Sequence, residues 1–231
     1  MSSSQLKEFY FDANNVAKQM GVSTQQIIEQ ASAWSRLGYN TQQTATEMAK
    51  LSSKFASISP GMDTTQAQEG LVSIMKAFDV DTNDVESKIM DKINILGNKF
   101  AESNLDIVEG LKRSSAAMAA MGQSFEDTAA LFTGGMEILQ DSESMGTALR
   151  SVAMRIRGYS EETGELDGEL QNVNGDVLAL TKTAKDAQGV SIFTDATQQH
   201  YKSMVQYLGE IADRWDDISE QNQTELLNKL F

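Results

Sequence analysis

The chain has 231 residues and a formal net charge of −14, and it contains no cysteine, one histidine and one proline. The lack of cysteine excludes disulfides, thiolate-bound zinc and a thiol nucleophile, and a single histidine excludes a two-histidine metal site. A hydrophobic content of 40% beside 23% charged residues is typical of a folded globular protein.

Six short polar segments have the residue pattern of a helix N-terminus. In each, a Ser, Asp or Asn is followed three residues later by Gln or Asp, so that a side-chain oxygen can accept hydrogen bonds from the first turn. The pairs are Ser23 and Gln26, Asn40 and Gln43, Asp63 and Gln66, Asp81 and Asp84, Ser103 and Asp106, and Ser124 and Asp127. The pattern predicts six helix starts.

An apolar stripe at three- and four-residue spacing follows each start, as in an amphipathic helix. The six stripes are Ile27, Ala31, Trp34; Ala45, Met48, Leu51, Phe55; Ala67, Leu71, Ile74, Phe78; Val85, Ile89, Leu96, Phe100; Leu105, Val108, Leu111, Met118; and Phe125, Ala129, Phe132, Met136, Leu139. A seventh comprises Met145, Leu149, Val152 and Ile156. Short capped helices with one apolar stripe must pack on one another. We therefore predict an all-α fold, with a compact multi-helix domain over residues 1–158.

Two adjacent glycines, Gly134 and Gly135, lie inside the sixth stripe. Each costs ~1 kcal/mol of helix stability relative to alanine. They predict either close helix packing or a local break in the helix, with a hinge as the alternative.

The chain changes character after Gly158. Residues 159–231 hold fourteen acidic and five basic residues, and residues 160–176 contain three glycines and few apolar side chains. We predict an acidic, glycine-rich loop or insertion over 159–189, in which residues 177–181 and 190–194 could pair as a small β-hairpin. Residues 190–231 are predicted to form a C-terminal helical segment, with one stripe of Tyr201, Met204, Leu208, Ile211, Trp215 and Ile218 and a second helix from Gln221. Since that second helix has no C-terminal cap, we expect the segment to be truncated.

The segment DVDTND at 79–84 has the alternating oxygen ligands of a calcium-binding EF-hand loop. The match then fails, because Asp84 stands where the loop needs glycine and Met90 where it needs glutamate. Helix capping by Asp81 explains the same residues. We therefore expect no metal here.

Other acidic residues and the histidine suggest no catalytic site. The acidic groups are Glu161, Glu162, Glu165 and Asp167 in the loop, and Asp216 and Asp217 after Trp215. A solvated surface explains them better than acid–base chemistry, and His200 stands among polar residues, as expected for an exposed or locally bonded histidine. The sequence has no phosphate-binding loop, HExxH or GxSxG motif. We predict no enzyme, no catalytic residue and no cofactor.

Three arginines lie within the segment GTALRSVAMRIRG at 146–158. Arg150 and Arg157 share one flank of the seventh stripe, whereas Arg155 lies on the other flank, near the helix end where cations favour the helix dipole. Three arginines in a chain of charge −14 neutralise few phosphates, so we expect no specific nucleic-acid binding. Met154 points away from the stripe between Arg150 and Arg157. We propose Arg150, Met154, Arg155 and Arg157 as a protein-interaction site.

The order of these segments resembles the core region of phage tail tape-measure proteins. The resemblance is carried by LGYNTQQTATEMAKLSSKF, GMDTTQAQEGLVSIMKAFDV, AESNLDIVEGLKRSSAAMAAMGQSFEDTAALFTGGMEI, SMGTALRSVAMRIRG and YKSMVQYLGEIADRWDDISEQNQTELLNKLF, and it covers about residues 14–158 and 190–231. It implies a structural role in tail assembly: templating tube length, occupying the tail lumen of the virion, and being present in the host cytoplasm during assembly. The implied partners are the tail tube protein, tail assembly chaperones and tail-tip proteins, with self-association as a further expectation.

These residues depart from that family in two ways. They contain no long helical ruler, and no apolar run reaches the ~20 residues that a membrane span needs, so we expect no membrane contact from them. The alternative function is a helical protein-binding module of a bacterial adaptor or secreted protein. The remainder of the reading frame would distinguish the two.

Overall fold

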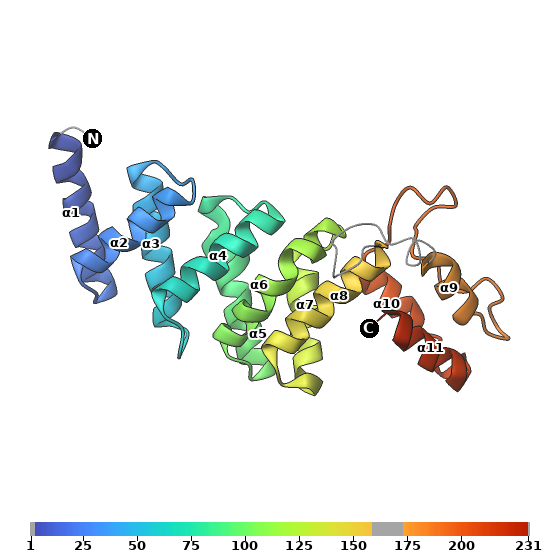
Figure 1. Cartoon of the computed structure of the whole chain (residues 1–231). Coiled ribbons are helices and arrows are strands. Elements are labelled where there is room, and N and C mark those ends of the chain that lie inside the picture. The colour runs from blue at the N-terminus through green and yellow to red at the C-terminus, as the bar shows by residue number, and fades with distance from the viewer. Residues whose placement is uncertain (1–2, 159–172, 231) are drawn as a thin grey trace. The chain divides into compact units, whose positions relative to one another are not determined.

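A computed structural model describes residues 3–158 and 173–230 (Figure 1). Within those residues the chain forms eleven α-helices and no β-sheet, which confirms the all-α prediction. The α-helices are α1 (Ser3–Met20), α2 (Thr24–Arg36), α3 (Gln42–Ser57), α4 (Thr64–Phe78), α5 (Asp91–Phe100), α6 (Asn104–Ala120), α7 (Phe125–Leu139), α8 (Ser142–Ile156), α9 (Val173–Leu180), α10 (Met204–Ala212) and α11 (Glu220–Leu230). Shorter turns of helix are η1 (Thr82–Asp84), η2 (Glu86–Met90) and η4 (Trp215–Asp217).

The chain divides into two compact units, and the division follows Lys112 within α6. Unit 1 comprises residues 1–112 and unit 2 comprises residues 113–231. The division predicted from composition, at residues 158 and 189, rests on charge and glycine content and remains a prediction. Most of the acidic segment 160–176 lies outside the described residues, but its last four residues belong to the helix α9.

The helix starts follow the predicted caps closely. Ser23 and Asp63 each form a full capping box with the glutamine three residues on, and Ser124 accepts from the backbone N–H of Asp127. One start was predicted a residue too early: Thr41, rather than Asn40, caps α3 and accepts from the N–H of Thr44 at 3.1 Å. Both residue types are good caps, so the local pattern does not choose between them.

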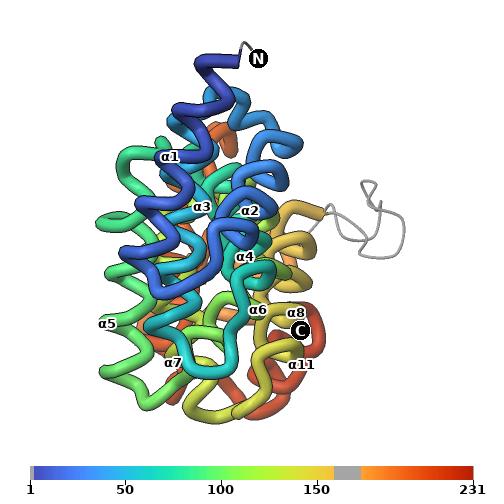
Figure 2. Tube along the Cα trace, turned by 90° about the vertical axis from the view of Figure 1, so that its left-hand side faces the viewer, coloured from blue at the N-terminus to red at the C-terminus, as the bar shows by residue number. Residues whose placement is uncertain are grey.

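The core of unit 1 is built from the predicted stripes of α2, α3 and α4. Trp34, Phe55 and Leu71 are fully buried, and helices α1 to α3 lie side by side in both views (Figures 1 and 2). The Trp34 indole N–H donates to the Ser52 hydroxyl at 2.9 Å, which satisfies a polar group in the middle of this core.

The fourth stripe was predicted correctly only in its first half. Val85 and Ile89 are buried as expected, but Leu96 and Phe100 are only half-buried. The reason is η2, a π-helical turn in which each hydrogen bond spans one residue more than in an α-helix. The extra residue changes which side chains of the following helix α5 face the core. The buried face continues through Ile93 and Gly97 instead.

Glycine allows two close helix contacts. A Cβ placed at Gly70 of α4 would lie 2.2 Å from Cγ1 of Val108 in α6, and one at Gly135 of α7 would lie 2.3 Å from Sδ of Met145 in α8. Close packing at Gly135 is therefore confirmed, and α7 runs unbroken through both of its glycines. Gly134 has no neighbour within 4 Å of such a Cβ.

Replacing Gly70 by alanine is expected to lower the free energy of unfolding by about 1–3 kcal/mol, because the methyl group overpacks against a stiff β-branched side chain. Gly134→Ala is the matched control, since it adds the same methyl group to an exposed helix position. It should instead raise stability by about 0.5–1 kcal/mol through helix propensity. Urea unfolding followed by circular dichroism measures both. Equal effects of the two substitutions would contradict the close α4–α6 contact.

The predicted hairpin at 177–194 is wrong. Residues 177–180 belong to α9, and residues 192–194 pair instead with residues 200–202. The N–H of Thr194 donates to the carbonyl of His200 and that of Lys202 to the carbonyl of Ile192, both at 2.8 Å. Between the two segments predicted to pair, the hydroxyl of Thr181 accepts a hydrogen bond from the N–H of Val190.

The predicted helix after residue 201 is shorter than its apolar stripe suggests. The helix α10 ends at Ala212, and Trp215 lies in the separate turn η4. Tyr207 is buried where Leu208 was expected, so the buried face of α10 is Met204, Tyr207 and Ile211. A further helix near Gln221 is confirmed as α11.

The Tyr207 side chain is 1% exposed and its hydroxyl has no hydrogen-bond partner among the described residues. Burial raises the pKa of this phenol. A buried hydroxyl without a partner carries a desolvation cost of about 1–3 kcal/mol. Tyr207→Phe is therefore expected to leave the fold intact and to raise the midpoint of urea unfolding. A clear loss of stability would show that the hydroxyl has a partner.

Candidate interaction surfaces

The helix α8 places the four predicted interaction residues on different surfaces. Arg150, Met154 and Arg157 follow one another at helical spacing on one face, and Arg155 lies on another. Arg150 is exposed, whereas Met154, Arg155 and Arg157 are half-buried. No ion pair joins Arg150 or Arg155 to any residue within the two described ranges.

Arg157 differs from the other arginines because its side chain is used inside unit 2. Its Nη2 donates to the carbonyl oxygen of Ala120 at the end of α6. Its guanidinium lies over the ring of Tyr201, 4.4 Å from the ring centroid. That distance is within the range of a cation–π contact. Arg157 therefore ties the C-terminal ends of α6 and α8 to the segment that precedes α10.

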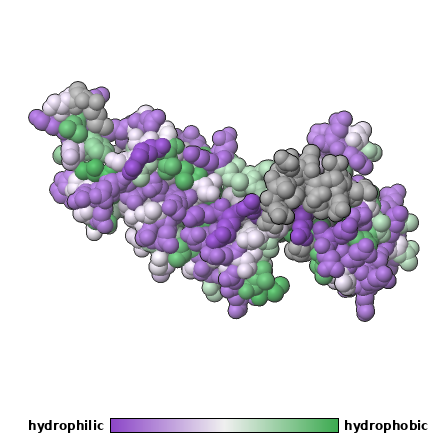
Figure 3. Space-filling view, viewed as in Figure 1, coloured by the Kyte–Doolittle hydropathy of each residue, from purple (hydrophilic) through white to green (hydrophobic). Residues whose placement is uncertain are grey.

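Unit 2 has an open apolar groove of about 530 Å³, here called the α7–α8 groove. Its lining comes from α7, α8, α10 and α11 and consists of Leu131, Gly135, Ile138, Leu139, Met145, Ala148, Leu149, Val152, Met204, Leu208 and Leu227. Ile138 is 86% exposed and Leu139 49%. Hydrophobic residues are visible where α7 ends and α8 begins (Figure 3).

The sequence contains a signal for this groove beside the sixth apolar stripe. Leu131, Gly135 and Ile138 form a second apolar series at four- and three-residue spacing, beside the buried series that contains Phe132 and Met136. One apolar series is enough for a helix to pack on the core, so a helix with two such series has apolar surface left for a second contact. Leu139 was predicted to be a core residue, but it lies at the exposed edge of the groove.

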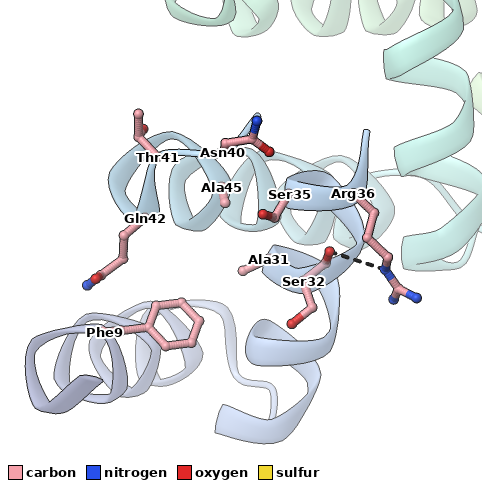
Figure 4. A pocket seen from close by; sticks show the side chains of 9 residues that line it. All are labelled: Phe9, Ala31, Ser32, Ser35, Arg36, Asn40, Thr41, Gln42 and Ala45. Atoms are coloured by element: carbon pink, nitrogen blue, oxygen red, sulfur yellow. Dashed lines mark hydrogen bonds between the residues drawn. The ribbon is translucent and has the colours of Figure 1, made fainter. Parts of the chain in front are cut away.

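Unit 1 has a more polar pocket of about 320 Å³ between α1, α2 and the start of α3 (Figure 4). The ring of Phe9 faces the hydroxyl groups of α2 across it, and the remaining lining is Ala31, Ser32, Ser35, Arg36, Asn40, Thr41, Gln42 and Ala45. The Nε–H of Arg36 donates to the carbonyl of Ser32 at 3.4 Å. The pocket brings together one cation and several hydroxyls, without a titratable acid–base pair.

The acidic candidates have local structural roles where they are described. Asp81 caps η1 and accepts from the N–H of Asn83 at 2.9 Å. Asp79 ends α4 in a left-handed conformation. Asp217 pairs with Lys185 at 2.8 Å. The acids Glu161, Glu162, Glu165 and Asp167 lie outside the described residues. Within residues 3–158 and 173–230, no group of three or more acidic or histidine side chains could hold a metal ion.

His200 is confirmed as an exposed, locally bonded histidine. Its Nδ1 lies 3.0 Å from Oδ2 of Asp195, and its side chain is 75% exposed. Hydrogen bonds from the Thr197 hydroxyl and from the backbone N–H groups of Gln199 and His200 lower the pKa of Asp195. These contacts hold the turn that joins residues 192–194 to residues 200–202.

Packed helices that present an open apolar groove are typical of structural and protein-binding domains. The family described as phage-related minor tail protein matches residues 12–231. The chain belongs to this family and is a component of a phage tail. No solved structure gives a significant match to it. None of the described helices combines the length and apolar content that a membrane span requires.

Proposed function

We propose that this chain is the core module of a phage tail tape-measure protein and acts through protein–protein contacts during tail assembly. The observation that carries the proposal is the order of its capped helices, from LGYN at residue 37 to RIRG at residue 158, together with the family match over residues 12–231. The exposed apolar groove of unit 2 supports it, since assembly proteins need such surfaces. The tail tube protein, the tail assembly chaperones and the tail-tip proteins are the proposed partners.

In this proposal the chain enters the assembling tail from the host cytoplasm and occupies the tail lumen. As a module of the tape-measure protein it takes part in templating tube length, although these residues contain no long helical ruler of their own. Its role is structural and uses no cofactor.

The test is deletion of residues 12–231 in frame from the gene in its phage or prophage, followed by electron microscopy of the tails. Loss of complete tails, restored by supplying the intact gene, supports the proposal. Protease protection of the chain in purified intact tails would support a position in the lumen. Normal tails after the deletion, or a chain fully accessible to protease on intact tails, would overturn it.

A further inference from the structure

The pocket of unit 1 that lies between α1, α2 and the start of α3, here called the α1–α2 pocket, has a volume of about 320 Å³. That volume is at the lower end of the range for small-molecule sites, roughly 300–1,000 Å³. Its apolar part consists of the ring of Phe9 on α1 and the methyl groups of Ala31 and Ala45, which are both buried. The pocket therefore has the size of a site for one small molecule.

Hydrogen bonds between helices hold the walls of this pocket in place. In the orientation that pairs donors with acceptors, the side-chain amide of Gln42 donates to the carbonyl of Gln5 at 3.2 Å and accepts from the N–H of Phe9 at 2.9 Å. The hydroxyl of Thr24 on α2 donates to the side-chain oxygen of Asn14 on α1 at 3.1 Å. Because these bonds tie α1 to both α2 and α3, the aromatic wall is in position before a ligand binds, which lowers the cost of binding.

Three polar side chains of the pocket are available to a ligand. Ser32 and Ser35 are three residues apart on α2, so their hydroxyls lie on one side of that helix, opposite the Phe9 ring (Figure 4). Asn40 lies in the turn that precedes α3. Within residues 3–158 and 173–230, no side-chain hydrogen bond involves these two hydroxyls or this amide. Each of the three groups can both donate and accept.

The lining does not suit an ion or a wholly apolar ligand. Among the described residues that line the pocket, Arg36 alone is charged. Its guanidinium lies on the opposite side of Ser32 from Phe9, and its Nε–H donates to the Ser32 carbonyl at 3.4 Å (Figure 4). An anion in the pocket would therefore lack a cation, and a cation would lack a carboxylate. A wholly apolar ligand would remove the serine hydroxyls from water without giving them a partner. These features favour a ligand that is neutral and polar.

We propose that the α1–α2 pocket binds one ring of a neutral carbohydrate. A sugar ring has apolar C–H patches, which pack on aromatic side chains, and hydroxyl groups that both donate and accept. In this pocket the C–H groups lie against Phe9, and the sugar hydroxyls bond to Ser32, Ser35 and Asn40. The proposal rests on this pocket alone and is independent of the role in tail assembly.

The experiment is a titration of the purified, ¹⁵N-labelled chain, in which the amide signals are followed by nuclear magnetic resonance. The neutral probes are glucose, N-acetylglucosamine and their disaccharides maltose and diacetylchitobiose, and the competing ligand classes are represented by glucuronate and adenine. Each is added up to about 50 mM, above the Kd on the order of 1–10 mM expected for so small a ligand.

Three variants are compared with the wild type. Phe9→Ala removes the aromatic wall, and Ser35→Leu fills the pocket while α1 is left unchanged. Phe11→Ala is the matched control, because Phe11 is on the same helix, is 66% exposed and does not line the pocket. Circular dichroism melts establish that each variant folds.

At least one neutral sugar is expected to shift the amide signals of Ser32, Ser35 and Asn40. Phe9→Ala and Ser35→Leu should each weaken its binding by about tenfold or more, whereas Phe11→Ala should bind like the wild type. Tighter binding of the disaccharide would support a sugar ring within a glycan, and equal affinity would support a free sugar.

Three results would overturn the proposal. The first is that no neutral sugar shifts these signals. The second is that Phe9→Ala and Ser35→Leu both bind as tightly as the wild type, or that Phe11→Ala loses binding as they do. The third is that glucuronate or adenine binds at these residues at least as tightly as the sugars, which would assign the pocket to an anion or to a nucleobase.

Discussion

Replacing Trp34 by alanine should lower the free energy of unfolding of unit 1 by about 3–5 kcal/mol, the usual cost of removing a large aromatic side chain from a core. Trp34 has no exposed surface. Its ring meets Tyr39 edge-on with 5.1 Å between centroids, and its indole N–H donates to Ser52 at 2.9 Å. The substitution therefore leaves a cavity and removes the partner of a buried hydroxyl.

Urea unfolding followed by far-ultraviolet circular dichroism measures this loss. The matched control is Trp215→Ala, because the chain has two tryptophans and Trp215 is only half-buried, in the short turn η4. The control should cost clearly less than Trp34→Ala. If both substitutions had the same effect, or if Trp34→Ala cost under about 1 kcal/mol, Trp34 would not be a core residue of unit 1.

Ser52→Ala separates the two contributions to this effect. It retains the ring of Trp34 but leaves the indole N–H without its partner, at a cost of about 1–3 kcal/mol. In the wild type the Ser52 hydroxyl also donates to the carbonyl of Met48 at 2.9 Å, so both its donor and its acceptor are paired.

The sequence predicted those parts of the fold that depend on neighbouring residues. The caps at Ser23, Asp63 and Ser124 and the buried series from Met145 to Ile156 are local patterns, since a cap involves three residues and a stripe involves one helix. The π-turn at Glu86–Met90 was not predictable in this way, because its residues are ordinary helix formers. The shift it causes is visible only in which later residues are buried.

Contacts between distant segments were the second limit. Residues 190–194 have the composition of a strand, but composition does not select between residues 177–181 and residues 200–202 as their partner. The polar turn from Asp195 to His200 selects residues 200–202 as the partner. In this turn the Asp195 carboxylate accepts from the backbone N–H groups of Gln199 and His200. Such a turn brings segments together that a search for two apolar runs does not pair.

The interaction residues show the same limit at the level of single side chains. The sequence grouped Arg150, Met154, Arg155 and Arg157 because they are close in one helix. It did not reveal that Arg157 reaches Ala120 and Tyr201, which are 37 and 44 positions away. The exposed apolar groove was likewise missed, because its lining comes from four helices.

Arg157→Met is expected to lower the stability of unit 2 by about 1–2.5 kcal/mol, whereas Arg150→Met should change it by less than about 0.5 kcal/mol. The first substitution removes a hydrogen-bond donor from the exposed Ala120 carbonyl, a loss of about 0.5–1.5 kcal/mol, and a contact with the Tyr201 ring, a loss of about 0.5–1 kcal/mol. The second removes the same group from an exposed position on the same helix.

Urea unfolding measures both arginine variants, and a double-mutant cycle of Arg157→Met with Tyr201→Leu isolates the stacking contribution, expected at about 0.5–1 kcal/mol. A coupling energy near zero would contradict the contact with the ring. If Arg150→Met were as destabilising as Arg157→Met, the two arginines would have the same role. The expected difference separates an arginine that packs within unit 2 from one that does not: Arg157 contacts Ala120 and Tyr201, whereas Arg150 forms no ion pair within residues 3–158 and 173–230.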